Sequence, residues 1–261
     1  MVRRWIQWSL LVLFADCGGP VAAQQVKDHI ALGLAATDAH DLRTALQHFQ
    51  AALDQDSTSY EANWRAAITL LTLGEQIGDN VKSTERDSLY AQAERYARSA
   101  VAADPAGADG HFALAASIGR ASLSMGKKDR IRRAAEIRSE ALRTIALNPR
   151  HDGAYHILGR WNAEIMRISG FSRFFAKSFL GAGIFGQASW GKAIYNMEKA
   201  VELDPTRIYH HLELAEIFAE RKRIPDAKTQ LHLVDSLPVR EVMDSVYKRQ
   251  GAAMLKRLKK K

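Results

Sequence analysis

Apolar residues recur three and four positions apart along most of the chain, which is the spacing of helices with one buried face. Four of these helical stretches end at a similar dipeptide, which is Asp-Pro or Asn-Pro in three of them and Asp-Ser in the fourth: residues 104–105, 148–149, 204–205 and 56–57. Proline disfavours helical geometry in the residue before it, so these dipeptides predict helix ends. The pattern therefore predicts an all-α chain in which one unit recurs.

The residues on either side of these turns fall into matching columns. Counting back twelve, eight and five positions from the proline column gives one helical face in each unit: Ala45/Phe49/Ala52, Ala93/Ala97/Ala100, Ile137/Ala141/Thr144 and Ala193/Met197/Ala200. Counting forward nine and ten positions gives a column with a small residue: Leu32-Gly33, Ala66-Ala67, Leu114-Ala115, Leu158-Gly159 and Leu214-Ala215. Small residues let helices approach closely, so the columns predict regularly packed helix pairs.

These columns resemble the 34-residue tetratricopeptide repeat (TPR). Five repeats fit, with extra segments of 14, 10 and 22 residues between the paired helices of the second, third and fourth, and they begin near Val26, Tyr60, Ala108, Asp152 and Ile208. The resemblance implies a right-handed superhelix of about five helix pairs, whose first helices line the concave side.

The predicted repeat region covers residues 24–241, and its longest insertion lies at about residues 170–187. A terminal helix is expected to follow and to cap the stack, with an apolar side made of Val242, Val246, Met254 and Leu255. This helix and a basic tail together make up residues 242–261.

The first 23 residues have the pattern of a secretory signal peptide: two arginines, an apolar run over residues 5–15, and small residues before Gln24. The apolar run is about half of the ~20 residues that a membrane-spanning helix needs. We therefore expect cleavage between Ala23 and Gln24 and a periplasmic or secreted protein. A lipid anchor on Cys17 is the alternative, although Asp16 is a poor fit to a lipoprotein cleavage box.

The net charge of +8 comes almost entirely from the tail. Residues 248–261 hold seven lysines and arginines and no acidic residue, whereas residues 24–247 hold 28 residues of each sign. Such a tail can attract an anionic lipid surface, or it can be a solvated helix end whose cations suit the helix dipole. Aromatic residues do not interleave with the second basic cluster, at residues 127–133, so no nucleic-acid partner is expected.

A narrower resemblance rests on the segment HILGRW from His156 to Trp161, on phenylalanines and glycine within residues 174–181, and on Asn63-Trp64-Arg65. Together these segments resemble the regulator of microtubule dynamics family, over roughly residues 60–240. The resemblance implies association with microtubules and organelle contact sites and, in one branch, phospholipid binding by the repeat domain. An exported chain would not meet cytoplasmic microtubules, so we do not expect that role here.

No catalytic set emerges from the sequence. One cysteine excludes a disulfide framework and a Cys-rich zinc site, and no metalloprotease, Walker or nucleophile-elbow motif is present. The G-x-G-x-x-G match at residues 181–186 lies outside any strand–helix unit, and the histidine spacings do not put two rings on one helix face. Acidic residues such as Glu213 and Glu216 are expected on solvated helix faces. We predict no enzymatic activity, no metal and no cofactor.

The candidate groove residues are polar or large side chains on the predicted first helices: Asn63, Arg65, His111, Tyr155, Arg160, Asn162 and His211. A row of phenylalanines at helical spacing has two interpretations: it packs as core near Trp161 and Trp190, or it lines an acyl-chain pocket with a cation nearby for the head group. The residues of this possible lipid contact are Phe171, Phe174, Phe175, Lys177, Phe179 and Phe185. The sequence thus predicts an exported scaffold that binds a protein or peptide, and the alternative is a phospholipid-binding or membrane-contact protein.

Overall fold

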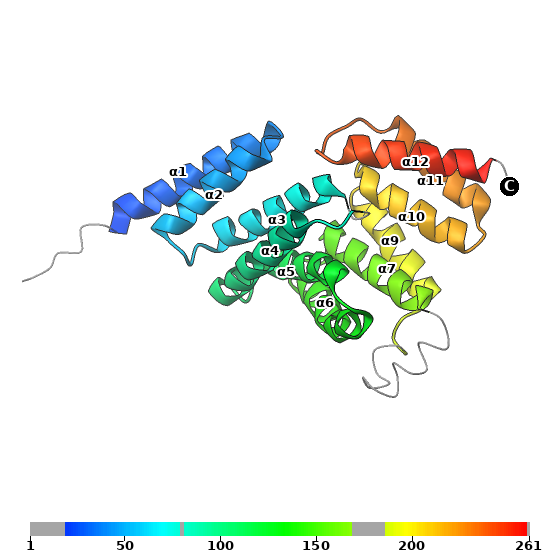
Figure 1. Cartoon of the computed structure of the whole chain (residues 1–261), viewed down its shortest axis with the longest axis horizontal. Helices are drawn as coiled ribbons and strands as arrows, with labels where there is room; N and C mark the ends of the chain where they lie inside the picture. Colours follow the sequence, from blue (N-terminus) through cyan, green and yellow to red (C-terminus); the bar gives the residue numbers. More distant parts are fainter. Residues whose placement is uncertain (1–18, 79–80, 169–185, 260–261) are drawn as a thin grey trace, which may run out of the picture.

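The computed structural model describes residues 19–78, 81–168 and 186–259. Within these ranges the chain forms eleven α-helices, one short 3-10 helix and no β-strand, so the all-α prediction is confirmed. The helices stack as five pairs and a closing helix (Figure 1): α1 (Gly19–Asp38) with α2 (Leu42–Gln55), α3 (Tyr60–Ile77) with α4 (Thr84–Ala103), α5 (Ala108–Ala121) with α6 (Lys127–Leu147), α7 (Asp152–Arg167) with α9 (Trp190–Leu203), α10 (Ile208–Glu220) with α11 (Ile224–Ser236), and α12 (Asp244–Leu258).

Four of the first helices begin at the residues where the sequence places repeat starts: Tyr60, Ala108, Asp152 and Ile208. The extra residues of the second and third units mostly lengthen helices, because α4 has 20 residues and α6 has 21. A 3-10 helix at Ser122–Ser124 joins α5 to α6. The insertions therefore keep each pair intact and extend it.

The turns between pairs share one hydrogen-bond pattern. In each, the side-chain oxygen of the helix-ending Asp or Asn accepts the main-chain N–H two residues later: Asp56 from Thr58 at 2.9 Å, Asp104 from Ala106 at 2.9 Å, Asn148 from Arg150 at 3.0 Å and Asp204 from Thr206 at 3.0 Å. Asp and Asn favour such turns because their short side chains reach this N–H. The dipeptide that ends each helix thus also shapes the turn.

The sequence columns form the contacts within each pair. Ala45, Ala93 and Ala193 have no exposed surface, and Phe49 and Met197 are fully buried beside them. A methyl group added at Gly33 would lie 2.4 Å from Phe49 Cε1, and one at Gly159 would lie 2.9 Å from Met197 Cε. The small residue of the first helix therefore makes room for the large residue of the second.

Helix α12 packs on the last pair with a different face from the predicted apolar side. Met254 is buried as expected, but Val246 and Leu255 are only partly buried, and Tyr247 and Gly251 take the central places. The start of the helix is fixed by the buried Asp244 carboxylate, which accepts the main-chain N–H groups of Arg240 and Glu241 at 2.8 Å each.

Helix α1 begins at Gly19 and so spans the predicted cleavage position between Ala23 and Gln24. Ala23, Gln24 and Gln25 are exposed, and the first buried side chain described is that of Val26. Cleavage there would remove Ala23, one of the residues that line a cavity between α1 and α3, and would keep Val26 and the other residues of that lining.

Candidate functional site

Four of the seven predicted groove residues are buried. Asn63, His111, Asn162 and His211 are between 2% and 7% exposed. Asn162 donates to the Leu158 carbonyl at 2.8 Å and accepts the Ser189 N–H at 3.2 Å, so it joins α7 to the start of α9. The structure corrects the prediction for these four, because their polar atoms are engaged within the chain.

Three of the buried residues make the same hydrogen bond, from the side chain to the main-chain carbonyl six residues earlier: Asn63 to Ser57 at 3.0 Å, His111 to Pro105 at 3.0 Å and His211 to Pro205 at 2.9 Å. These carbonyls belong to the turns, where no helix supplies a donor. The side chain supplies that donor, so a polar residue at this position stabilises the turn. The position is a structural one in each of these repeats.

The other three predicted residues keep some exposed surface. The Arg65 guanidinium lies 4.2 Å from the centre of the Trp64 ring and 2.8 Å from Glu61, with 24% of its side chain exposed. Tyr155 is partly buried against the core between α7 and α9. Arg160 points toward α10, where its guanidinium lies 3.1 Å from Glu213 and donates to the Tyr209 hydroxyl.

Arg160 belongs to a polar cluster that links the first helices to one another and to α12. We call it the inner cluster and define it as Glu75, Arg120, Arg160, Tyr209, Glu213 and Tyr247. Arg120 of α5 pairs with Glu75 of α3, and Arg160 of α7 pairs with Glu213 of α10. The two charges of each pair balance, which is the usual condition for holding charged groups out of water. Glu213 is 7% exposed, so its expected place on a solvated face is wrong.

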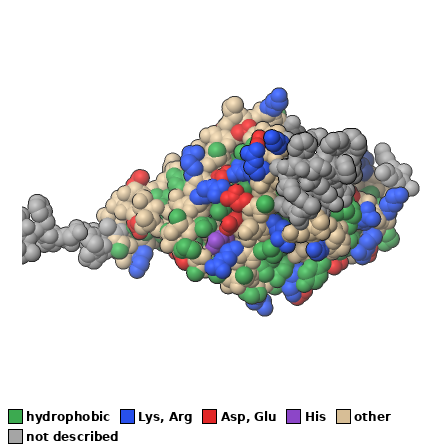
Figure 2. Space-filling view, turned by 90° about the horizontal axis from the view of Figure 1, so that it is seen from below, with side chains coloured by type: hydrophobic (Ala, Val, Ile, Leu, Met, Phe, Trp, Pro, Cys, Tyr) green, Lys and Arg blue, Asp and Glu red, His purple; other side chains and the backbone are tan. Residues whose placement is uncertain are grey.

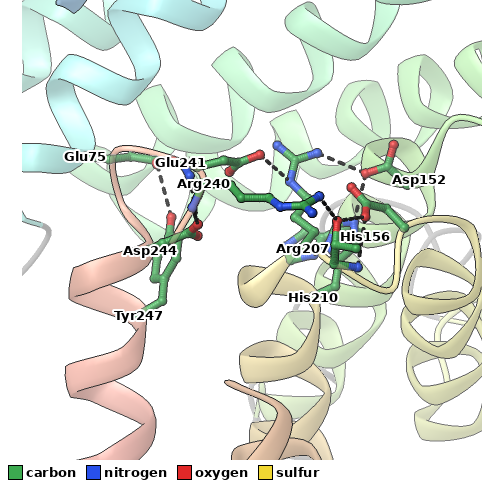
Figure 3. A network of polar contacts seen from close by, with 11 residues as sticks. Glu75, Asp152, His156, Arg207, His210, Arg240, Glu241, Asp244 and Tyr247 are labelled. Atoms are coloured by element: carbon green, nitrogen blue, oxygen red, sulfur yellow. Dashed lines mark hydrogen bonds and ion pairs between the residues drawn. The ribbon is translucent and has the colours of Figure 1, made fainter. Parts of the chain in front are cut away.

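Tyr247 closes the inner cluster from the opposite side. Its ring stacks on Tyr209 with centroids 4.5 Å apart and planes 12° apart, and its hydroxyl donates to Glu75 at 3.4 Å (Figure 3). Burial raises the pKa of both tyrosines well above the usual value, so both rings stay neutral. Helix α12 thereby reaches α3, and the helix pairs between them form an arc (Figure 1).

A second polar network, which contains two buried histidines, lies beside the inner cluster at the contact of α7 and α10 (Figure 3). The Asp152 carboxylate lies 2.9 Å from His210 Nε2 and 2.9 Å from the Arg207 guanidinium. His210 Nδ1 in turn lies 2.9 Å from His156 Nδ1, and Arg207 lies 3.2 Å from Glu241. The network therefore connects α7, α10 and the segment that precedes α12.

Burial and charge set the protonation of this network. Burial opposes ionisation of Asp152, but the hydrogen bond from His210 and the charge of Arg207 outweigh it and hold the Asp152 pKa well below its usual range. Burial, followed by the proximity of His210, lowers the pKa of His156 far below 6.5, and burial also lowers that of His210. Both rings are therefore neutral at pH 7. Within the described part of the chain, His156 Nε2 is buried without a hydrogen-bond partner.

Two cavities open at opposite ends of the first-helix side. The N-terminal cavity has a volume of about 460 Å³ and lies between α1 and α3, lined by Ala23, Val26, Lys27, Ile30, Asp56, Ser59 and Glu61. The C-terminal cavity has a volume of about 510 Å³ and lies between α10 and α12, lined by Glu216, Gln250, Ala253, Met254, Lys256 and Arg257. Both combine apolar and charged side chains.

The face in Figure 2 has acidic and basic side chains interleaved near the middle of the molecule. Ion pairs of this kind join the second helices α4 and α6, where Arg98 lies 2.7 Å from Glu94 and 2.8 Å from Glu136. Arg133 of α6 also pairs with Glu94. These ion pairs join the two second helices to each other.

The residues predicted to contact lipid, Phe171, Phe174, Phe175, Lys177, Phe179 and Phe185, lie outside the described residues. Among the residues that are described, no three His, Cys, Asp or Glu side chains converge as metal ligands. The described helices also include none with the length and apolar character required to cross a bilayer.

Sequence reasoning missed most of the inner cluster. Glu75 and Arg120 lie at the ends of first helices. Tyr209 follows Ile208, where a repeat is predicted to begin, and Tyr247 follows Val246, on the predicted apolar side of the terminal helix. A partial signal exists, because Glu75 and Arg120 both follow closely after buried apolar positions of their helices. The contacts themselves have no local signature in the sequence, because Glu75 lies 45 residues from Arg120 and 172 residues from Tyr247.

The stacked helix pairs, the repeated turn and the matched small and large residues define a tetratricopeptide-repeat protein. The sequence profile described as "Regulator of microtubule dynamics protein 1-3" matches residues 30–259. The chain therefore belongs to the regulator of microtubule dynamics family. No curated protein matches it.

Solved structures show the same fold. TTC0263, a thermophilic TPR protein of Thermus thermophilus, is 17% identical with a TM-score of 0.63, and the match covers 87% of this chain and 99% of that one. Pseudomonas aeruginosa pilF is 16% identical with a TM-score of 0.54, over 91% of this chain and 93% of that one. At these identities the likeness establishes the fold, and the function has to be argued from the surface.

Proposed function

We propose that this chain is an exported, non-enzymatic scaffold that binds a segment of a protein partner on the side lined by its first helices. Helical repeat proteins typically present extended surfaces of this kind. The observation that carries the proposal is the N-terminal cavity between α1 and α3, where the side chains of Val26 and Ile30 form an apolar floor beside charged Lys27, Asp56 and Glu61. An apolar centre with a polar rim is typical of protein interfaces.

The neighbouring residues on α3 support the same surface. Trp64 is partly exposed, and Arg65 lies over its ring at 4.2 Å. Tryptophan and arginine are among the side chains most enriched at positions that dominate binding energy at interfaces. The stacking also holds the Arg65 side chain in place before a partner binds, which reduces the entropy lost on association.

The inner cluster limits where such a segment can lie. Tyr247 of α12 fills the space between Tyr209 and Glu75, so α12 already covers the middle of the first-helix side. A partner that ran along all the first helices would have to displace this contact. We therefore place the bound segment at the α1–α3 end.

Site-specific photo-crosslinking tests this proposal in the cells that make the protein. A photoreactive amino acid replaces Lys27, which lines the N-terminal cavity, or Arg95, which is an exposed residue of α4 and serves as the control. We expect a discrete covalent adduct with a protein at position 27 and none at position 95. Absence of an adduct at position 27, or the same adducts at both positions, would contradict the proposal.

Export is tested separately by the N-terminus of the protein isolated from those cells. Cleavage between Ala23 and Gln24 would give a chain that begins at Gln24 and is recovered from the periplasmic or culture fraction. Mass spectrometry of the intact protein distinguishes this from a chain that retains residue 1 and from one that begins at a lipid-modified Cys17. Either of the latter two would overturn this part of the proposal.

A further inference from the structure

The C-terminal cavity lies at the other end of the first-helix side, between α10 and α12. Four of its six lining residues are polar or charged, namely Glu216, Gln250, Lys256 and Arg257. Among the described residues that line it, Ala253 and Met254 have apolar side chains, and the long polar side chains also present their carbon atoms to the cavity. The lining therefore suits a ligand that combines apolar and charged groups.

The cations of this cavity differ from three arginines of the first helices. Arg120, Arg160 and Arg167 each pair with a glutamate of an adjacent helix. Lys256 and Arg257 are exposed and form no ion pair with any residue that the structure describes. Two uncompensated positive charges thus border a cavity in a protein that otherwise pairs many of its arginines, which favours an anionic ligand.

Glu216 contributes an acidic group to the same cavity. The carboxyl is partly buried and makes no hydrogen bond or ion pair within the described residues. Burial, and then the neighbouring Glu213 carboxylate, raise its pKa to about 7. The charged groups around it come from its own helix, from α7 and from α12: Glu213, Glu220, Arg160, Arg167, Lys256 and Arg257.

We propose that the C-terminal cavity binds an acidic segment of a protein partner, whose carboxylates pair with Lys256 and Arg257. This inference rests on the proposed scaffold function and specifies the chemistry of a second contact on the same side of the molecule. A protonated Glu216 donates a hydrogen bond to a ligand carboxylate, whereas an ionised Glu216 repels it. The carboxylates of the ligand stay ionised at pH 6, because their usual pKa is near 4. Affinity therefore increases as the pH falls from 8 to 6.

Fluorescence anisotropy of a rhodamine-labelled peptide of alternating Asp and Ala residues tests the inference on the purified protein. Reversal of both cations, Lys256→Glu with Arg257→Glu, should weaken binding at pH 6 by about tenfold, because two attractions become repulsions. The matched control is Lys128→Glu with Arg130→Glu, which makes the same change of charge on exposed residues of α6 and should leave affinity unchanged. Circular dichroism shows whether each variant is folded.

The Glu216→Gln variant tests the role of the buried carboxyl. Glutamine cannot ionise, so this variant should bind the peptide at pH 8 as tightly as the unmodified protein does at pH 6, with little dependence on pH. An affinity at pH 8 equal to that of the unmodified protein would overturn the role of Glu216.

Three results would contradict the inference that the ligand is an acidic protein segment. The first is that the α6 control variant weakens peptide binding as much as the α12 variant does, and the second is that the peptide does not bind. The third is binding to vesicles containing phosphatidylglycerol without binding to the peptide, which would assign the cations to a lipid headgroup. Crosslinking at Lys27 reports on the N-terminal cavity. An adduct at Lys27 without peptide binding would therefore reject only the proposed ligand of the C-terminal cavity. Absence of both would reject the scaffold function itself.

Discussion

Hydrogen bonds to the turns explain the polar residues that recur near the start of the first helices. Asn63, His111 and His211 each donate to a turn carbonyl six residues earlier. The side chains of neighbouring helix residues point about 100° apart. A shift of one position therefore decides whether a side chain faces the turn or the surface. In the same helix Trp64, one residue after Asn63, keeps exposed surface. Polarity alone does not distinguish the two roles.

The histidine network predicts a specific pH dependence of stability. The pKa values of His156 and His210 lie below 6.5 in the folded protein. The unfolded chain therefore binds protons near pH 6.5 that the folded chain does not, and stability falls as the pH decreases below 6.5, by up to about 1.4 kcal/mol per pH unit for each proton. Replacement of His156→Asn keeps a hydrogen-bonding group near His210 and should make this decrease shallower.

Urea denaturation at pH 5, 6, 7 and 8 measures the effect. The exposed residue His232 provides the matched control, and its replacement by Asn should retain the full slope. Glu216 and Glu241, whose pKa values are raised, act in the opposite sense between pH 4.5 and 7, but they are present in all three proteins and cancel in the comparison. Equal slopes for the His156→Asn variant and the unmodified protein would contradict the prediction.

Within each helix pair, stability depends on a close approach that glycine permits. Gly33 faces Phe49 and Gly159 faces Met197, so both glycines accommodate a large side chain from the partner helix. Gly119 of α5, by contrast, has no described residue from another part of the chain within 4 Å of the place where a methyl group would be added. The same residue type therefore has a packing role at two positions and none at the third.

Alanine substitutions separate these roles. Gly33→Ala should destabilise the protein by about 1–3 kcal/mol, because the new methyl group meets Phe49 at 2.4 Å. Gly119→Ala should stabilise it by about 0.5–1 kcal/mol, because alanine loses less backbone entropy in a helix. The measurement is the free energy of unfolding in urea, and a change of the same sign in both variants would be inconsistent with this packing.

For the molecule as a whole, α12 connects helices that lie far apart in the sequence. Its Tyr247 reaches Glu75 of α3 across 172 residues of sequence, and it does so while stacked on Tyr209 of α10. The pair α1–α2 lies at the opposite end of the stack from α12 (Figure 1). The contact of α12 with α3 therefore spans the arc of the last four pairs and does not include the first pair.

Replacing Tyr247 should loosen this arc. Spin labels on cysteines introduced at the exposed Gln76 and Arg249, in a chain whose only cysteine, Cys17, is changed to Ser, report the distance between α3 and α12. Tyr247→Ala removes the stacked ring and should broaden the distance distribution. Tyr247→Phe keeps the ring and loses one hydrogen bond of about 1 kcal/mol, so it should leave the distribution narrow. A narrow distribution in both variants would show that other contacts hold α12.

Local and medium-range features of the fold were predictable from the sequence. The starts of α3, α5, α7 and α10, the Asp or Asn turns and the buried columns all follow from spacing within about 34 residues, because helix periodicity and turn chemistry are local properties. Of the seven candidate groove residues, Arg65, Tyr155 and Arg160 keep exposed surface, and the other four hold turns and helix contacts.

The sequence by itself determined that this protein is a stack of helix pairs of the tetratricopeptide type, because a repeated local pattern can be satisfied only by a repeated local structure. Only the tertiary structure decided that Glu75 meets Tyr247 and that Arg120 and Arg160 pair with glutamates of neighbouring helices. It also decided that Lys256 and Arg257 are left without ion-pair partners beside Glu216 in the part of the chain that the structure describes. These contacts depend on the small rotation between successive pairs, which accumulates along the stack and brings distant elements together.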